Sequence, residues 1–315
     1  MSPSEFVSTS HHPLADGHAW GWEIAVYLFL GGFTAGLLVL SGLARRRGPR
    51  ATGEPGFALA SSGLSIVGLG AISLGMLALF LDLAHKPFVW RLYVTMEPRS
   101  PMSWGAWILL LVYPVLLTGI ALDPPRALRD RVPALARLAR YAEDERVRRG
   151  LGLASIAAGL ALGVYTGILL SALGARPLWS SGLLGPLFLV SGLSTGAAFA
   201  HMASPLAEER HRLARLDNLL IAVELALIAL YLIGLASSTE AHAEAAKLLL
   251  GGPYTAVFWV VVVGVGLVAP LAIQALTVAG RIAPTHVAPV LVLIGGIVLR
   301  FVLVFAGQAS HWSRL

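Results

Sequence analysis

Ionisable and phenolic side chains lie inside or beside long apolar stretches of this 315-residue sequence. Glu23 and Tyr27 are four residues apart, so on a helix they share one face. Asp82 and His85, three residues apart, form a second such pair. A charge in hydrocarbon is costly, so these groups are expected to face a cavity or a partner. Carboxylate, imidazole and phenol groups are the usual acceptors and donors of protons.

Three further side chains of this kind lie later in the sequence: Tyr165, Glu224 and Arg300. Each of the seven also has an ordinary structural interpretation. A carboxylate can end a helix, a tyrosine can pack with its hydroxyl bonded, a histidine can lie on the surface, and an arginine can extend toward the interface or neutralise a carboxylate. For Glu224 a structural hydrogen bond and a proton-relay role compete evenly.

The elements that must position these groups are eight apolar stretches, each about long enough for a helix to cross a bilayer. With 57% hydrophobic and 13% charged residues, and a mean hydropathy of +0.76, too little polar surface remains for a soluble core. Backbone in lipid must satisfy its hydrogen bonds internally, which helices do. We therefore predict an all-α integral membrane protein with eight transmembrane helices, at residues 20–43, 57–84, 102–122, 149–172, 181–203, 217–236, 251–279 and 285–307.

The distribution of arginine and lysine predicts the orientation. The connections after the first, third, fifth and seventh spans carry sixteen of the 23 Lys and Arg residues, and the other side carries six. The positive-inside rule places the first set in the cytoplasm and both termini outside. Basic residues between spans are topology signals, so the charge balance does not indicate a nucleic-acid partner. The segment Val132–Ala142 is interpreted either as a short helix lying on anionic membrane lipid or as an unattached charged loop.

A short glycine motif occurs twice. Gly-Phe-Thr-Ala-Gly at 32–36 resembles Gly-Leu-Ser-Thr-Gly at 192–196, an offset of 160 residues. Both motifs lie in spans that open a set of four, which predicts two four-helix bundles related by an axis along the membrane normal. Close helix packing alone would also explain the glycines. The predicted organisation is an outer tail 1–19, a first bundle 20–172, a second bundle 173–308 and an outer tail 309–315.

Several redox centres are excluded by composition. The sequence has no cysteine, so it holds no disulfide and no iron–sulfur cluster ligated by thiolates. Haem requires axial ligands inside the bundle, whereas the nine histidines fall in tails, loops or the ends of spans. We predict neither haem nor a metal site, and interpret Glu240, His242 and Glu244 as a solvated loop. The first nineteen residues also lack the pattern of a signal peptide.

Most of the ionisable groups map to the outer half of the predicted membrane. Carboxylate, phenol and imidazole groups beside an apolar cleft suit a ligand with an apolar tail and a redox-active headgroup that exchanges protons. Quinol fits, because removing two electrons from it also requires removing two protons. The alternative is a secondary transporter or proton channel, whose folds also use repeats and buried charges, commonly with helices broken at the midplane.

Several strings, in order, resemble the NrfD / polysulfide reductase membrane subunit family. Asp-Leu-Ala-His-Lys-Pro at 82–87, Trp90-Arg91 and Ser-Pro-Met-Ser-Trp-Gly-Ala-Trp at 100–107 come first. The resemblance covers residues from about 20 to 308, and its specificity lies in the ordered combination. It continues through Tyr165-Thr166-Gly167, Arg-Pro-Leu-Trp at 176–179, residues 191–198, Glu224-Leu225, residues 299–301 and residues 306–308.

This resemblance implies a haem-free membrane subunit of a bacterial respiratory oxidoreductase complex, lying in the inner membrane and reacting with menaquinone or ubiquinone. It also implies an extracytoplasmic, ferredoxin-like iron–sulfur subunit as partner, and beyond it a catalytic subunit that holds molybdopterin or several haems. The chain alone would not be a complete enzyme. The family's quinone site lies in the first bundle near the outer surface, where its span-four tyrosine corresponds to Tyr165 and its span-two aspartate to Asp82.

The resulting hypothesis gives each residue a role. Tyr165 would hydrogen-bond a quinone carbonyl, and Asp82, His85 and Glu23 would exchange its protons. A second set would line or anchor the quinone site: Tyr27, Trp22, Trp90, Arg91, Trp104 and Arg176. Glu224 and Arg300 would belong to a proton path toward the cytoplasm.

Overall fold

The computed structural model describes residues 20–47, 62–83, 85–95, 97, 100–172, 176–283 and 285–311. In these ranges the polypeptide is helical with short connections and has no strand. Eight helices in the described residues are long and apolar enough to cross a membrane, which confirms the predicted fold class. The predicted tail 1–19, with His11, His12 and His18, and residues 312–315 lie outside the described residues.

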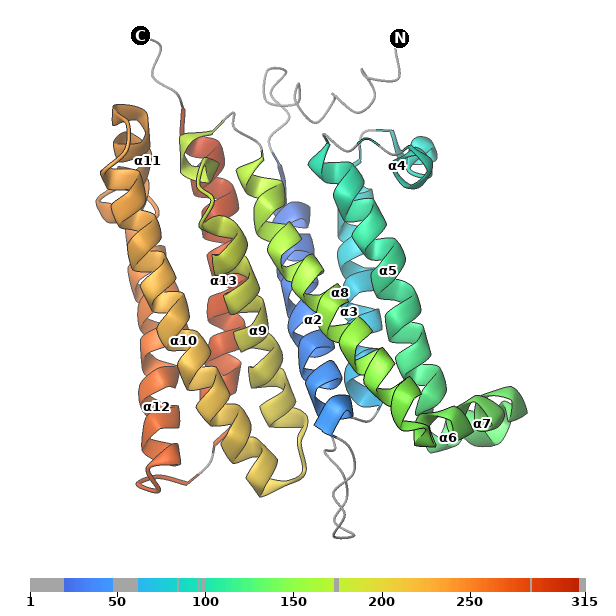
Figure 1. Ribbon diagram of the computed structural model, residues 1–315. Coiled ribbons are helices and arrows are strands. Elements are labelled where there is room, and N and C mark those ends of the chain that lie inside the picture. Colours follow the sequence, from blue (N-terminus) through green and yellow to red (C-terminus); the bar gives the residue numbers. More distant parts are fainter. Residues whose placement is uncertain are drawn as a thin grey trace.

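The first four spans pack around one another, and short helices lie before the third span at one end and after it at the other (Figure 1). Proline stands at the first turn of α5, where its missing N–H costs nothing. The spans are α2 (Trp22–Arg47), α3 (Ser62–Asp82), α5 (Pro101–Leu122) and α8 (Glu145–Ser171). The short helices are η2 (Lys86–Phe88) and α4 (Arg91–Val94) before α5, then α6 (Arg126–Arg131), α7 (Pro133–Ala139) and η3 (Arg140–Glu143) before α8.

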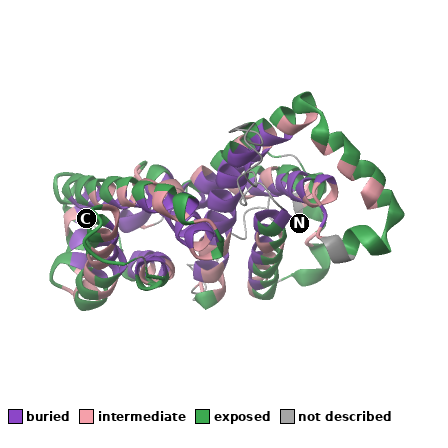
Figure 2. Cartoon of the chain, turned by 90° about the horizontal axis from the view of Figure 1, so that it is seen from below, coloured by how far each residue is buried: buried purple, intermediate pink, exposed green. Residues whose placement is uncertain are grey.

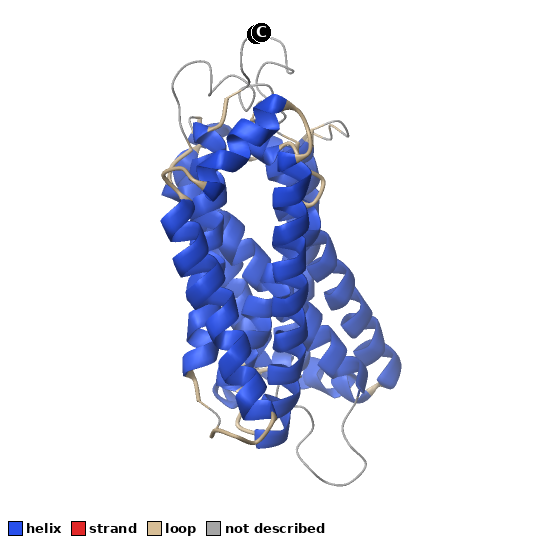
Figure 3. Ribbon diagram, turned by 90° about the vertical axis from the view of Figure 1, so that its left-hand side faces the viewer, coloured by secondary structure: helices blue, strands red, loops and turns tan. Residues whose placement is uncertain are grey.

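The second four spans form a similar group, in which η5 is a π-helix that continues into α12 as one span. Viewed from the side, the long helices run between two ends, where the connections lie (Figure 3). We call the end that carries α6 and α7 the basic end and the other the opposite end; α2 begins and α13 finishes at the opposite end (Figure 1). The elements are η4 (Pro177–Trp179), α9 (Leu184–Ala203), α10 (Ala207–Ala236), α11 (Glu240–Leu250), η5 (Val257–Val268), α12 (Ala269–Val278) and α13 (Val287–Ala309).

Helices α2 and α9 form the centre of the molecule. In the most apolar stretch of α2, 83% of the residues are buried, against 39% in that of α3. Buried residues gather along the middle of the molecule in Figure 2. The two glycine motifs lie against each other here. A β-carbon on Gly192 would lie 2.5 Å from the Gly32 carbonyl oxygen, and one on Gly196 would lie 2.8 Å from the Gly36 Cα. The repeated motif therefore brings the backbones of α2 and α9 together.

Helices α10 and α8 begin several residues before the predicted spans. Helix α10 begins at Ala207, ten residues before the predicted span, because Glu208 pairs with Arg212 one turn later and acidic side chains in a first turn favour a helix. Glu224 is consequently much farther from the start of its helix than the two turns expected. Helix α8 begins earlier because the Asp144 side chain accepts the Arg146 N–H at 2.8 Å.

Two interpretations of charged segments were wrong. Residues 240–244 begin the helix α11 and are no solvated loop: His242 is only 9% exposed, and its Nδ1 lies 2.6 Å from the Thr239 hydroxyl. The helix forms because Ala241, Ala245, Ala246 and Leu249 are buried on one face. Arg45, expected in a connection, lies in α2 and donates to the Gly119 carbonyl at 3.2 Å. Of the two interpretations of Val132–Ala142, the structure supports a helical segment, α7 and η3.

Candidate functional site

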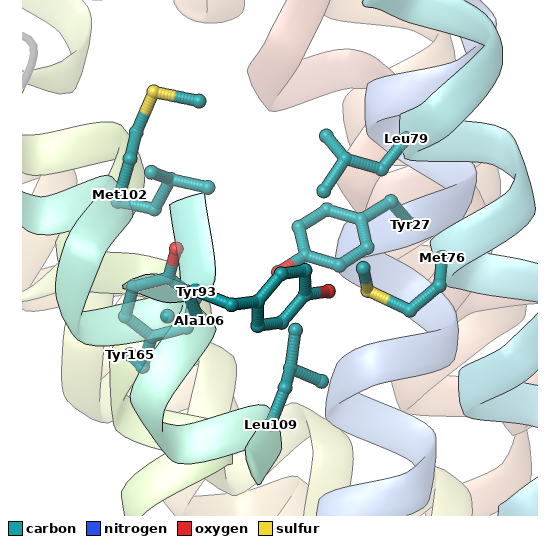
Figure 4. A pocket seen from close by; sticks show the side chains of 10 residues that line it. Tyr27, Met76, Leu79, Tyr93, Met102, Ala106, Leu109 and Tyr165 are labelled. Carbon is teal, nitrogen blue, oxygen red and sulfur yellow. The ribbon is translucent and has the colours of Figure 1, made fainter. Parts of the chain in front are cut away.

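A pocket opens among the first four spans toward the opposite end. Three phenols, Tyr27, Tyr93 and Tyr165, provide its polar groups. The empty volume is about 390 Å³, which includes the part that is open to solvent. Figure 4 shows the three rings next to one another, with Met102 on one side and Met76 and Leu79 on the other. The remaining lining residues are Gly105, Ala106, Leu109 and Leu169. Apolar walls with a few polar groups suit a ligand that has an apolar body and a small number of hydrogen-bonding atoms.

Tyr27 and Tyr165 are the deepest polar groups of the pocket. They come from the adjacent helices α2 and α8, are 1% and 6% exposed, and interact electrostatically with each other. Tyr165 reaches the α5 backbone because Gly105 has no side chain: a β-carbon there would overlap the Tyr165 hydroxyl. This part of the pocket therefore forms because a large residue on α8, Tyr165, lies opposite a glycine on α5, Gly105.

Tyr93, which the sequence analysis did not single out, enters the pocket from the short helix α4. Burial raises the pKa of its phenol, and the nearby Tyr113 adds to this, so the phenol remains protonated at neutral pH. The connection is held in place at both ends. The Arg91 guanidinium lies 4.6 Å from the Phe88 ring, and the Ser103 hydroxyl of α5 donates to the Thr95 carbonyl at 3.2 Å.

The predicted proton-exchanging residues lie at the same end of the molecule as the pocket but do not line it. Glu23 is in the first turn of α2, Asp82 ends α3, and His85 precedes η2. Glu23 and Asp82 are partly exposed and His85 is exposed. Of the catalytic residues predicted from the sequence, the structure brings Tyr165 alone into the pocket lining, where it meets Tyr27 from the second set.

The other residues predicted to line or anchor the site lie on the surface or serve packing. Trp22, Trp90 and Trp104 are 51%, 54% and 58% exposed, as expected for tryptophans at a membrane interface. Arg176 is bonded elsewhere: it donates to the Ser310 carbonyl at 2.9 Å, beyond the end of α13. Its neighbour Trp179 is fully buried and donates to the Leu303 carbonyl at 2.8 Å.

Glu224 and Arg300 meet in the second group of helices. The Arg300 guanidinium donates to the Ser191 hydroxyl at 2.5 Å and to the Phe188 carbonyl at 3.1 Å, and its Cζ lies 4.5 Å from the centre of the Phe188 ring. Glu224 interacts electrostatically with Arg300 and with the same Ser191. Both ionisable side chains are at most 2% exposed, so they form a buried centre of opposite charges.

Asp217 extends this centre toward the basic end and was not recognised in the sequence. It is 1% exposed, accepts the Ser194 hydroxyl at 2.6 Å and accepts the Gln274 amide at 2.7 Å. Asp217 and Glu224 are seven residues apart on α10, hence on one helix face. That spacing was the available signal, but Asp217 stood at the predicted start of its span and therefore resembled an interfacial residue.

The geometry agrees with comparisons to known proteins. A family model described as polysulphide reductase, NrfD, matches residues 11–310. This chain belongs to that family. Protein NrfD of Escherichia coli K12 is 34% identical over 305 residues, covering 92% of this chain and 95% of that protein. A polysulfide reductase chain of Wolinella succinogenes is 30% identical over 303 residues, covering 92% and 94%. A selenate reductase subunit of Mesobacillus selenatarsenatis is 24% identical over 330 residues, covering 94% and 76%.

As an NrfD-family member with eight apolar helices, the protein is a multi-pass membrane protein. Its two halves differ at the opposite end. The position 160 residues after Tyr27 is Leu187, which is fully buried. Nearby, η4 inserts Leu178 and Trp179 into the core, and the Tyr231 hydroxyl donates to the Leu178 carbonyl at 2.6 Å. In the described residues of this NrfD-family protein, the part of the second half around Leu187 is therefore packed with buried side chains.

Proposed function

We propose that this chain is the quinone-reactive membrane subunit of a respiratory oxidoreductase. The observation that carries the proposal is the pair of buried, neighbouring phenols, Tyr27 and Tyr165, in a pocket walled by methionine and leucine. A quinone has the matching chemistry, since its ring and tail are apolar and its carbonyl oxygens accept hydrogen bonds. The names of two relatives, one a chain of polysulfide reductase and the other a subunit of selenate reductase, support a role within a larger reductase.

In this proposal, each group of residues in and near the pocket has a separate role. Tyr165 and Tyr27 orient the quinone head by hydrogen bonds, and Tyr93 completes the polar side from α4. Met76, Leu79 and the other apolar residues exclude water and contact the ring and tail. The quinone, menaquinone or ubiquinone, supplies the two-electron, two-proton chemistry. Asp82, His85 and Glu23 lie outside the lining, so in this proposal they pass protons between the phenols and the medium.

Electrons must reach the pocket from another subunit, because the sequence has no cysteine that could hold an iron–sulfur cluster. In the proposal, a ferredoxin-like iron–sulfur subunit docks at the opposite end, and a catalytic subunit with molybdopterin or several haems lies beyond it. The exposed Trp90, Trp104 and Arg91 at this end belong to the docking surface or the membrane interface. The opposite end then faces the periplasm of a bacterial inner membrane.

The buried centre of the second half supplies a proton path in this proposal. Glu224 and Asp217 are acceptors two helical turns apart, and the Ser194 hydroxyl of α9 donates to Asp217. Arg300 interacts electrostatically with Glu224 and also borders α2, because a β-carbon on Gly32 would lie 3.2 Å from its Nη2. Protons would enter from the basic end through Asp217.

Replacing Tyr165 by phenylalanine tests the quinone site. Loss of one hydrogen bond of about 1 kcal/mol should weaken binding of a short-chain quinone analogue to the purified protein roughly fivefold. Tryptophan fluorescence quenching measures the dissociation constant. Tyr231→Phe is the matched control, since it removes a buried hydroxyl from the other half and should leave that constant unchanged.

Unchanged affinity in Tyr165→Phe would contradict the assignment of the pocket. The transporter or channel alternative makes a different prediction. Liposomes containing the chain alone would then conduct protons without quinone or a partner subunit. Such a flux would replace the proposed function by the alternative.

A further inference from the structure

The segment between α5 and α8 carries a surface that the proposed function does not use. We call residues 126–143, which comprise α6, α7 and η3, the basic arm. Four of its arginines are exposed, and so are four apolar side chains. The arginines are Arg129, Arg131, Arg137 and Arg140, and the apolar residues are Leu128, Val132, Leu138 and Tyr141.

Contacts with two spans fix the position of the basic arm. Helix α7 and η3 contact α5, and η3 also contacts α8. Ala142 packs on the core cluster that includes Leu122, the last residue of α5, and Leu151 of α8. Val132 is extended (φ −124°, ψ 94°), so the backbone bends between α6 and α7. The arm is therefore held where the apolar spans finish, and it extends sideways from the helices (Figures 1 and 2).

The arginines of the arm differ from those in the first turns of α10, which also lie at the basic end. Arg210 donates to the Ser204 and Pro205 carbonyls, and Arg212 pairs with Glu208. In the ranges that the structure describes, the four arginines of the arm have no ion-pair partner within the protein. Their charge is available to something outside the protein, and the nearest surface at that level is the membrane itself.

We propose that the basic arm binds the headgroups of anionic phospholipids in the leaflet at the basic end. Arginines at a lipid surface each strengthen such binding roughly fivefold, and they favour negatively charged headgroups. The exposed Leu138 and Tyr141, 42% and 61% accessible, supply the apolar contact that an interfacial segment makes at the boundary of headgroups and acyl chains. The proposal requires that the protein spans a membrane and does not depend on the quinone site.

The absence of cysteine allows a site-specific test with the full-length protein. Tyr141→Cys, labelled with an environment-sensitive fluorophore, is reconstituted into nanodiscs of phosphatidylcholine with or without phosphatidylglycerol. We expect a blue shift of emission, and quenching by lipid-borne quenchers, only with phosphatidylglycerol, and loss of both at high salt. The label at Leu138→Cys gives a second measurement should the first variant assemble poorly.

Combining the label with Arg137→Gln and Arg140→Gln should abolish the shift. The matched control, Arg212→Gln with Arg215→Gln, removes two arginines from the same end and should leave it intact. A label that stays water-exposed with phosphatidylglycerol, or that shifts equally in both lipids, would overturn the proposal. So would a shift produced by inorganic phosphate in phosphatidylcholine discs, because the ligand would then be a free anion.

Discussion

At the scale of single residues, the pocket depends on a small residue opposite each large one. Tyr165 lies where the side chain of residue 105 would be, and the Tyr27 ring lies 3.6 Å from where a β-carbon of Gly75 would stand. The Tyr165 phenol is thereby held against the backbone of α5, which is less free to rearrange than a flexible side chain.

Gly105→Ala should therefore disturb the quinone site as strongly as loss of the Tyr165 hydroxyl. The new β-carbon displaces the phenol, so binding of the quinone analogue should weaken at least roughly fivefold. Gly70→Ala on α3 is the control, since nothing lies within 4 Å of its β-carbon, and it should leave the affinity unchanged. Equal affinities in the two variants would show that the ligand does not contact the Tyr165 phenol beside Gly105.

Glu224→Gln tests the proton path in the assembled complex. The substitution keeps the shape of the buried side chain but removes its exchangeable charge. We expect proton uptake from the basic end to be lost and binding of the quinone analogue to stay unchanged, as measured by a pH-sensitive dye in proteoliposomes. Glu208→Gln, at an exposed position of the same helix, is the control. Normal proton uptake in Glu224→Gln would make the residue structural.

Residue types at helical spacing pointed to part of the site. Tyr27, Tyr165, Glu224 and Arg300 stood out because a polar group inside an apolar span is costly. Tyr93 did not, because α4 has only four residues and no apolar periodicity that would aim a side chain. Its place in the pocket depends on the fold of the whole connection. Sequence alone also could not show that the Arg176 side chain is bonded to the end of α13.

At the scale of elements, the crossing of α2 and α9 determines how the halves meet. Both helices use their glycine motif at the contact, so backbone lies on backbone. The eight spans and this motif could be predicted from hydropathy and from the repeat. The early start of α10 and the existence of α11 could not be predicted in this way, because both segments contain many polar residues. Their helices are stabilised by ion pairs, by charges at the helix ends and by tertiary packing.

Gly192→Ala should destabilise this crossing. Its β-carbon would lie 2.5–3.0 Å from three backbone atoms of Gly32, and overpacking of this kind costs about 1–3 kcal/mol. The midpoint of thermal unfolding in detergent should fall. Gly234→Ala on α10, with nothing within 4 Å, is the control and should leave the midpoint unchanged or raise it. A midpoint unaffected by Gly192→Ala would mean that the helices are farther apart than described.

At the scale of the whole molecule, arginine content alone predicts which end faces the cytoplasm. Single cysteines in this cysteine-free protein test the prediction, with Ser238→Cys at the opposite end and Arg212→Cys at the basic end, both exposed. A membrane-impermeant maleimide should label the first in intact spheroplasts and the second only after permeabilisation. The reverse pattern would invert the topology and move the proposed partner to the cytoplasm.

Leu178 and Trp179 of η4 are buried in the core of the second half. The two halves of the protein therefore differ chemically at the opposite end, although each has four spans. In the proposed complex, a redox partner would therefore gain nothing from docking midway between the two halves. Electron transfer weakens steeply with separation, so the partner's nearest cluster would have to be placed off-centre, above α4 and the beginning of α5. The assembled complex would then be a tilted one, with part of this protein's outer face left for other contacts.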